Sequence, residues 1–163
     1  MLDLLGPLGH GFEISSRALL LLAGGIGIAP LVALAEKGIA DGAQVTLVLG
    51  APKKAQLYPP HLLPAEAKLV VATEDGSVGR KGMVTDLLAE LAPEADQIFA
   101  CGPVSMYRAI AALIKGEKSV QVSMEVRMGC GFGGCYGCGI ETKKGVKLVC
   151  QDGPVFDLKD IIW

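Results

Sequence analysis

The sequence has 163 residues, which is enough for one ordinary domain and a small additional module but excludes two large domains. Its composition, 51% hydrophobic with 22 glycines, suits a buried sheet joined by tight turns and excludes a disordered chain. The net charge is -2 and no window concentrates lysine and arginine, which excludes the basic surface of a nucleic-acid-binding protein.

Residues 1–17 contain the turn-prone segment Gly6-Pro7-Leu8-Gly9 and too little apolar periodicity for an independent fold. We interpret them as a remnant of, or a linker from, another domain. They have no basic segment before an apolar one, so no signal peptide is predicted. Four of the five cysteines are crowded together, which favours a metal in a reducing compartment, and the cytoplasm is the expected location.

Residues 18–124 alternate short apolar runs with segments that have helical patterning. Because the apolar runs hardly alternate with polar residues, both faces of the sheet should be covered. The pattern therefore predicts an α/β fold with a doubly wound parallel five-stranded sheet, which would bind a dinucleotide at the carboxyl ends of its strands. The expected strands are Ala18–Leu22, Val45–Leu49, Leu69–Ala72, Ile98–Ala100 and Val120–Ser123, and the expected helices are Pro30–Lys37, Met83–Leu91 and Val104–Ile114.

Ala18–Ala35 is an uncharged stretch at the lower length limit of a membrane-spanning helix. Its three glycines would each cost about 1 kcal/mol in a helix and its proline about 3 kcal/mol. The sequence therefore predicts a strand, a turn and a new helix here, and no membrane association.

The turn after the first strand contains Gly24, Gly25 and Gly27, followed by Ala29 and Pro30. Small residues before a helix N-terminus let a pyrophosphate approach the free amides and the positive end of the helix dipole. We therefore expect these residues to bind the dinucleotide. The alternative is that the glycines serve only close packing at a strand-to-helix corner.

Two further segments follow predicted strands at the same edge of the sheet. Glu74 and Asp75 could offer carboxylates to a ribose hydroxyl, although a solvated acidic turn would have the same sequence. Residues 50–54, after the second strand, contain two lysines and no acidic residue, which leaves the choice between NAD and NADP open.

The other segment at this edge is Cys101-Gly102-Pro103, which follows the predicted strand Ile98–Ala100 and precedes a predicted helix. Gly102 and Pro103 are candidate nucleotide-binding residues. Cys101 is the candidate catalytic thiol beside a nicotinamide ring; the alternative is a small apolar residue that closes the strand.

We predict that residues 125–163 form a second, small module built around a glycine-rich cysteine loop. Cys130, Cys135 and Cys138 have the spacing C-x4-C-x2-C, and eleven residues separate Cys138 from Cys150. The C-x4-C-x2-C spacing is that of plant-type ferredoxins, which bind a 2Fe-2S cluster. Such a cluster needs four thiolates and backbone amides that face it. Six glycines between residues 129 and 139 allow the tight curl that such a loop requires. The C-terminal Trp163 is expected to pack on the core.

Two other uses of these cysteines stay open on spacing alone. A four-cysteine zinc site usually has two C-x2-C pairs, and only Cys135 and Cys138 form one here. Disulfides are the third possibility.

Together these motifs resemble the ferredoxin-reductase superfamily, whose nucleotide-binding domains contain a Gly-Gly-x-Gly-x-Ala-Pro turn and a later Cys-Gly-Pro. The tail is similar to the electron-transfer subunit of two-subunit, NAD-linked dihydroorotate dehydrogenase, and the resemblance extends over essentially the whole chain. The segments that carry it are residues 24–30, 74–77, 81–87, 101–103, 125–138 and 149–156.

The resemblance implies a subunit that carries a 2Fe-2S cluster and FAD and connects NAD(H) with the FMN of a catalytic partner, which oxidises dihydroorotate in pyrimidine biosynthesis. It implies a hetero-oligomer in which this oxidoreductase subunit is inactive alone. The family's flavin-binding barrel has no counterpart before Arg17, so we expect either that another chain supplies it or that the sequence is a fragment. The alternatives are a subunit of another flavin and iron–sulfur oxidoreductase, such as a hydrogenase, and a zinc-stabilised nucleotide-binding module without redox chemistry.

Overall fold

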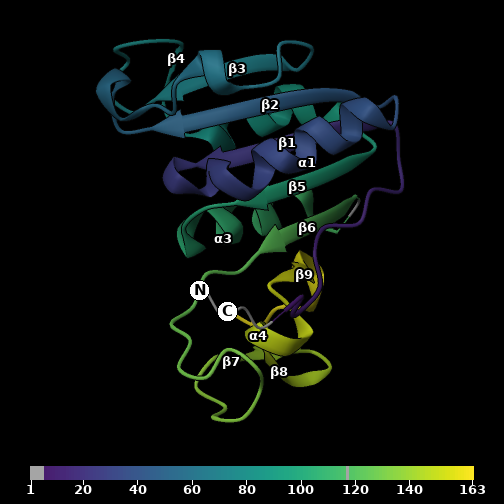
Figure 1. Cartoon of the computed structure of the whole chain (residues 1–163). Coiled ribbons are helices and arrows are strands. Elements are labelled where there is room, and N and C mark those ends of the chain that lie inside the picture. Colours follow the sequence, from purple (N-terminus) through teal and green to yellow (C-terminus); the bar gives the residue numbers. More distant parts are fainter. Residues whose placement is uncertain (1–5, 117) are drawn as a thin grey trace, which may run out of the picture.

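The computed structural model describes residues 6–116 and 118–163, which form a seven-stranded sheet and, beyond one of its edges, a module with a two-stranded hairpin (Figure 1). The strand order in the sheet is β4-β3-β2-β1-β5-β6-β9. The strands are β1 (Ala18–Gly24), β2 (Gln44–Ala51), β3 (Lys68–Thr73), β4 (Arg80–Lys81), β5 (Gln97–Cys101), β6 (Ser119–Ser123), β7 (Gly139–Thr142), β8 (Gly145–Leu148) and β9 (Val155–Asp157). The α-helices are α1 (Ile28–Ala40), α2 (Leu88–Leu91), α3 (Val104–Ile114) and α4 (Val149–Asp152).

The five central strands are the five that the sequence predicts, and all of them run parallel in the order β3-β2-β1-β5-β6. This confirms the doubly wound parallel sheet. Two edge strands were not predicted: β4, which has two exposed residues, and β9, which has three residues and runs antiparallel to β6. Neither is long enough to show a period-two pattern.

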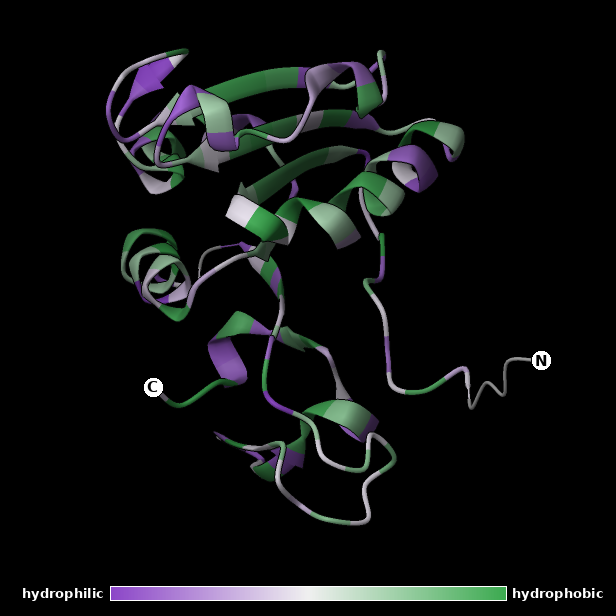
Figure 2. Ribbon diagram, turned by 60° about the vertical axis from the view of Figure 1, so that its left-hand side comes forward, coloured by the Kyte–Doolittle hydropathy of each residue, from purple (hydrophilic) through white to green (hydrophobic). Residues whose placement is uncertain are grey.

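Both faces of the sheet are covered, as the apolar strands require. Leu20 and Leu22 of β1 pack in one core with α2, α3 and the C-terminal module. Leu19 and Leu21 point to the other face and pack with α1. Figure 2 shows the central strands coloured as hydrophobic along most of their length. Among the described residues, no helix combines the length and the apolar character needed to cross a bilayer.

The helix expected over Met83–Leu91 is divided in the structure. A 3-10 turn at Val84–Leu87 leads into the four-residue helix α2, and a second 3-10 turn follows at Ala92–Glu94. Pro93 has no amide N–H to donate to the carbonyl four residues earlier, so the regular helical ladder ends after one turn. The segment still covers the sheet, because Leu87, Leu88 and Leu91 are buried.

The C-terminal module is joined to the sheet by β9. Its Phe156 pairs with Val122 of β6, and the amide of Met124, directly after β6, donates to the carbonyl of Pro154 (2.8 Å). Figure 1 shows β7, β8 and α4 beyond this edge of the sheet. The cysteine module is therefore held against the β6 edge of the parallel sheet.

The N-terminal segment 6–17 contacts both the C-terminal module and the sheet. Residues 1–5 of the predicted linker lie outside the described residues. His10 forms a bridge with Pro154 of the C-terminal module. Phe12 packs edge-on against Phe99 of β5, with 5.6 Å between ring centroids. Gln97, buried at the start of β5, accepts hydrogen bonds from the amide (3.0 Å) and hydroxyl (3.2 Å) of Ser15 and donates to the carbonyl of Glu13 (2.8 Å).

Replacing Gln97 with alanine should lower the free energy of unfolding by about 2 kcal/mol, because a buried side chain and its three hydrogen bonds to Glu13 and Ser15 of the N-terminal segment are lost. Chemical denaturation measures this change. The matched control is Gln56→Ala, because the Gln56 side chain is exposed, and it should change stability by less than about 0.5 kcal/mol. Equal effects of the two variants would contradict an anchoring role for Gln97.

Candidate functional site

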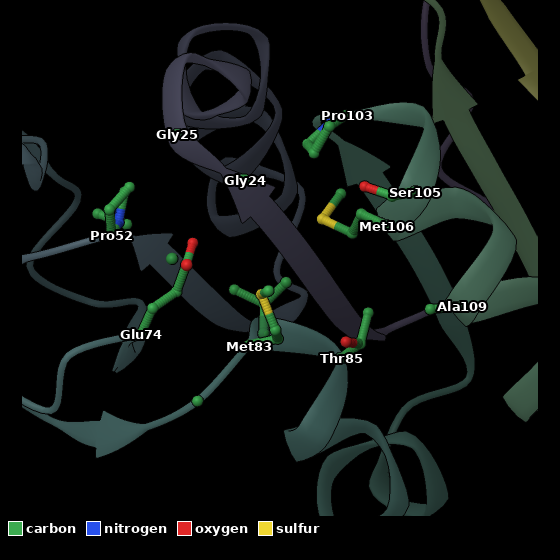
Figure 3. Close-up of a pocket in the computed structure, with 14 residues that line it drawn as sticks. Gly24, Gly25, Pro52, Glu74, Met83, Thr85, Pro103, Ser105, Met106 and Ala109 are labelled. Atoms are coloured by element: carbon green, nitrogen blue, oxygen red, sulfur yellow. The ribbon is translucent and has the colours of Figure 1, made fainter.

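A cavity of about 460 Å³ opens at the carboxyl ends of β1, β2, β3 and β5, where the sequence predicts a dinucleotide. Figure 3 shows Pro52, Glu74 and Met83 toward one side of the cavity and Pro103, Ser105 and Met106 toward the other. Its lining residues are Gly24, Gly25, Gly50, Ala51, Pro52, Glu74, Gly82, Met83, Val84, Thr85, Pro103, Ser105, Met106 and Ala109.

The three predicted glycines of the first turn meet different demands. A Cβ at Gly27 would lie 1.9 Å from the carbonyl oxygen of Cys101, so this glycine allows the turn to pack directly on β5. A Cβ at Gly24 would lie 2.9 Å from Pro103 Cδ, so the two turns at the cavity touch. Gly25 has φ +57° with open space around its Cα, and it faces the cavity. The steric interpretation therefore holds for Gly27, and Gly25 is the glycine that leaves room for a ligand.

The helix α1 continues from this turn with an uncapped N-terminus. No side chain accepts a hydrogen bond from its first-turn amides, and Ala29 and Pro30 are exposed there. Ala29 and Pro30 do not line the cavity but border the helix end next to it. The amide of Ile28 donates within the preceding 3-10 turn and Pro30 has no amide N–H, so the feature of this end that suits the pyrophosphate of a dinucleotide is the positive end of the helix dipole.

The two predicted carboxylates behave differently. Glu74 lines the cavity. Asp75 accepts the amide of Ser77 (2.9 Å), and hydrogen bonds with Ser77 hold the pKa of its carboxyl below the usual value. Asp75 thus stabilises the turn after β3, whereas the Glu74 carboxylate is free to meet a ligand.

Sequence analysis missed several residues on the cavity wall. Thr85 and Ser105 contribute hydroxyl groups, and Met83 and Met106 contribute thioethers. Ser105 lies in the first turn of α3, two residues after Pro103, so its place after the Cys-Gly-Pro turn was the available signal. Met83 and Thr85 come from the 3-10 region near β4, an edge strand too short to be recognised.

Cys101 ends β5 but does not line the cavity. Its thiol is partly buried and lies 3.9 Å from the carbonyl oxygen of Ser123. Burial raises the pKa of this thiol, so it stays protonated at neutral pH. The structure thus places Cys101 beside the neighbouring turn residues Gly102 and Pro103, of which Pro103 lines the cavity.

The four cysteines of the C-terminal module are arranged as two pairs. Sγ of Cys138 lies 3.2 Å from Sγ of Cys150, and both residues are buried. Sγ of Cys130 accepts the amide of Cys135 (3.3 Å) and contacts the Cys135 thiol. Among the described residues, no three histidine, cysteine or acidic side chains surround a single ion position. A 2Fe-2S cluster takes four cysteine thiolates, and these four cysteines are the predicted set.

Backbone amides in the loop stabilise thiolates. The amides of Phe132 and Cys135 lower the pKa of Cys130 to about 6. The amide of Cys150, 3.5 Å from Sγ of Cys138, lowers the pKa of Cys138, whereas the Cys138 thiol raises that of Cys150. Because cluster ligands must be deprotonated, these amides prepare the loop for metal.

The loop geometry fits a compact anionic group. Gly131 and Gly133 have φ +79° and +88°, which turn the chain back on itself between Cys130 and Cys135. Cys150 comes from the short helix α4, whose start is fixed by Asp152 accepting the amide of Leu148 (2.8 Å). All four predicted ligands therefore belong to one compact region, with Cys138 and Cys150 inside and Cys135 exposed.

Comparison with known families divides the chain at the same place as these two sites. Residues 21–112 match the family described as the oxidoreductase NAD-binding domain. Residues 125–162 match the iron-sulfur cluster binding domain of dihydroorotate dehydrogenase B.

Curated relatives match nearly the whole chain. Two of them are named dihydroorotate dehydrogenase B (NAD(+)), electron transfer subunit, from Bacillus cereus (strain Q1) and Bacillus anthracis (strain A0248). Each is 37% identical over 171 aligned positions, which cover 99% of this chain and 66% of the relative. The chain thus spans slightly less than two thirds of their length.

Two solved structures resemble the fold. A structure described as NADH-dependent reduced ferredoxin-NADP oxidoreductase, studied for flavin-based electron bifurcation, has a TM-score of 0.88 and 33% identity, and the match covers 99% of this chain and 60% of that one. The ferredoxin reductase in carbazole 1,9a-dioxygenase has a TM-score of 0.54 and 21% identity over 64% of this chain and 36% of that one, which shows the fold alone.

Proposed function

Because the chain belongs to the oxidoreductase NAD-binding domain family and carries the iron–sulfur domain of dihydroorotate dehydrogenase B, we propose that it is an electron-transfer subunit for dihydroorotate oxidation. It would pass electrons between the FMN of a catalytic partner and NAD, in pyrimidine biosynthesis in the cytoplasm. The proposed division is residues 1–17 as a linker, 18–124 as the NAD-binding domain and 125–163 as the 2Fe-2S module.

The observation that carries this proposal is that a cavity at the strand ends and a four-cysteine module belong to one continuous scaffold. The nucleotide cavity lies at the ends of β1, β2, β3 and β5, and the cysteine module is fixed to β6, the strand next to β5, through β9.

In the proposed mechanism the residues of this chain bind and orient. Gly25 and the N-terminal end of α1 would hold the pyrophosphate, and Glu74 would hold a ribose hydroxyl. Cys130, Cys135, Cys138 and Cys150 hold the cluster, and the exposed Cys135 side faces outward, where a partner can approach. When bound, nicotinamide exchanges electrons in pairs and a 2Fe-2S cluster takes them singly, so a flavin such as FAD would be needed between them.

A second candidate keeps both sites and changes the partner. The relative with a TM-score of 0.88 is an NADH-dependent reduced ferredoxin-NADP oxidoreductase. This similarity favours a subunit of another flavin and iron–sulfur oxidoreductase as the alternative. The two candidates differ in whether a dihydroorotate-oxidising FMN subunit associates with the chain.

The first experiment is a visible absorption spectrum, with iron and acid-labile sulfide assays, on protein purified without air. We expect a reddish protein with about two irons and two sulfides per chain that is bleached by dithionite. Addition of dihydroorotate, NAD(+), FAD and an FMN-containing dihydroorotate dehydrogenase catalytic subunit should then produce dihydroorotate-dependent reduction of NAD(+) to NADH. A colourless protein containing zinc would overturn the redox function, and a reddish protein inactive with that subunit would favour the second candidate.

A further inference from the structure

Tyr107 is the largest fully buried side chain close to both sites. It belongs to the first turn of α3, is 1% exposed and points its hydroxyl toward the ends of β5 and β6. The hydroxyl accepts the amide of Gly102 (2.9 Å) and donates to the carbonyl of Ser123 (2.6 Å).

These two hydrogen bonds lie where the parallel ladder stops. Cys101 and Ser123 are the last paired residues of β5 and β6. Beyond them β5 turns into Gly102-Pro103 at the nucleotide cavity, and β6 continues into Met124 and the cysteine module. The Tyr107 hydroxyl therefore links the end of β6 to the turn after β5, where the segments that lead to the two sites diverge.

The surroundings of Tyr107 keep this bridge neutral and fixed. Burial raises the pKa of the phenol, so the hydroxyl keeps its proton and can donate at any physiological pH. Trp163, which was expected to pack on the core, is instead 40% exposed; one side of its ring faces Tyr107, with 6.0 Å between centroids and a tilt of 34°. A cavity of about 270 Å³ lies against the same residues, lined in part by Gly102, Tyr107 and Met124.

We propose that Tyr107 is a positioning residue for the nicotinamide nucleotide site, whose hydroxyl holds the Cys101-Gly102-Pro103 turn in register with the strand end that leads to the cluster module. The proposal rests on the nucleotide-binding role proposed above for this turn. It adds a residue that touches neither nucleotide nor cluster and acts through the Gly102 amide and the Ser123 carbonyl.

The test is Tyr107→Phe, which keeps the ring in the core and removes only the hydroxyl. Losing a buried hydrogen bond that orders the turn should raise the dissociation constant for NADH about fivefold to tenfold. Iron and sulfide content should stay unchanged. Tyr58→Phe is the matched control, because Tyr58 is partly buried on the other face of the sheet, and its NADH affinity should change less than twofold.

Three results would overturn the proposal, and they separate it from the proposed function. If Tyr107→Phe lowers the melting temperature but leaves NADH affinity within twofold, Tyr107 is only a packing residue. If the wild-type chain binds no NADH, the nucleotide-binding function fails as well. Amide exchange of the wild-type protein provides a measurement that needs no variant: Gly102 should be protected, and exchange at the rate of an unbonded amide would contradict the bridge.

Discussion

Replacing Cys135 with alanine should abolish the cluster, with iron falling from about two per chain to nearly none and the visible absorption lost, because each iron needs two thiolates. Cys135 is the best position for this test because it is exposed and contributes little to the core. Its loss therefore removes a ligand without leaving a cavity. Iron and sulfide assays on anaerobically purified protein, with the visible spectrum, measure the change.

The matched control is Cys101→Ala, since Cys101 is the one cysteine of the five outside the C-terminal module and its substitution should leave iron content unchanged. A Cys135→Ala variant that keeps two irons and the wild-type spectrum would remove Cys135 from the ligand set. Cys150→Ala should also lose the cluster, but with a larger loss of stability, because Cys150 is only 6% exposed and packs in the core.

The nucleotide-binding sheet was predictable because its signals are local. Each central strand is an apolar run bounded by turn residues, and β1 buries consecutive leucines on alternating faces. The cysteine spacing likewise gives the candidate ligands without knowledge of the fold.

What sequence analysis missed depends on contacts between distant segments. The strand β9 exists because Val155–Asp157 meets β6, and three residues carry no pattern of their own. The buried Gln97 has a role only because residues 13 and 15 return across the start of β5. Adjacent residues Glu74 and Asp75 look equivalent in sequence, and only the fold separates a cavity residue from a turn residue.

Because Glu74 lines the cavity and Asp75 does not, Glu74 is expected to determine the preference between NADH and NADPH. The segment after β2 offers two lysines, Lys53 and Lys54, which would favour the extra phosphate of NADP. Glu74 is the acidic residue on the cavity wall, and a carboxylate there can accept a ribose hydroxyl and repel a phosphate. Glu74→Gln keeps the shape and removes the charge, so the preference for NADH over NADPH should fall about tenfold.

Asp75→Asn is the control that makes this prediction sharp, because it removes the same charge one residue away. Since Asp75 is engaged by Ser77 and does not line the cavity, its substitution should disturb the turn and change the NADH to NADPH preference less than twofold. Dissociation constants for both nucleotides at fixed ionic strength measure the ratio. If both variants shift the preference equally, the general negative charge near β3 selects the nucleotide. If only Glu74→Gln does, one carboxylate outweighs the two neighbouring lysines because it alone lines the cavity.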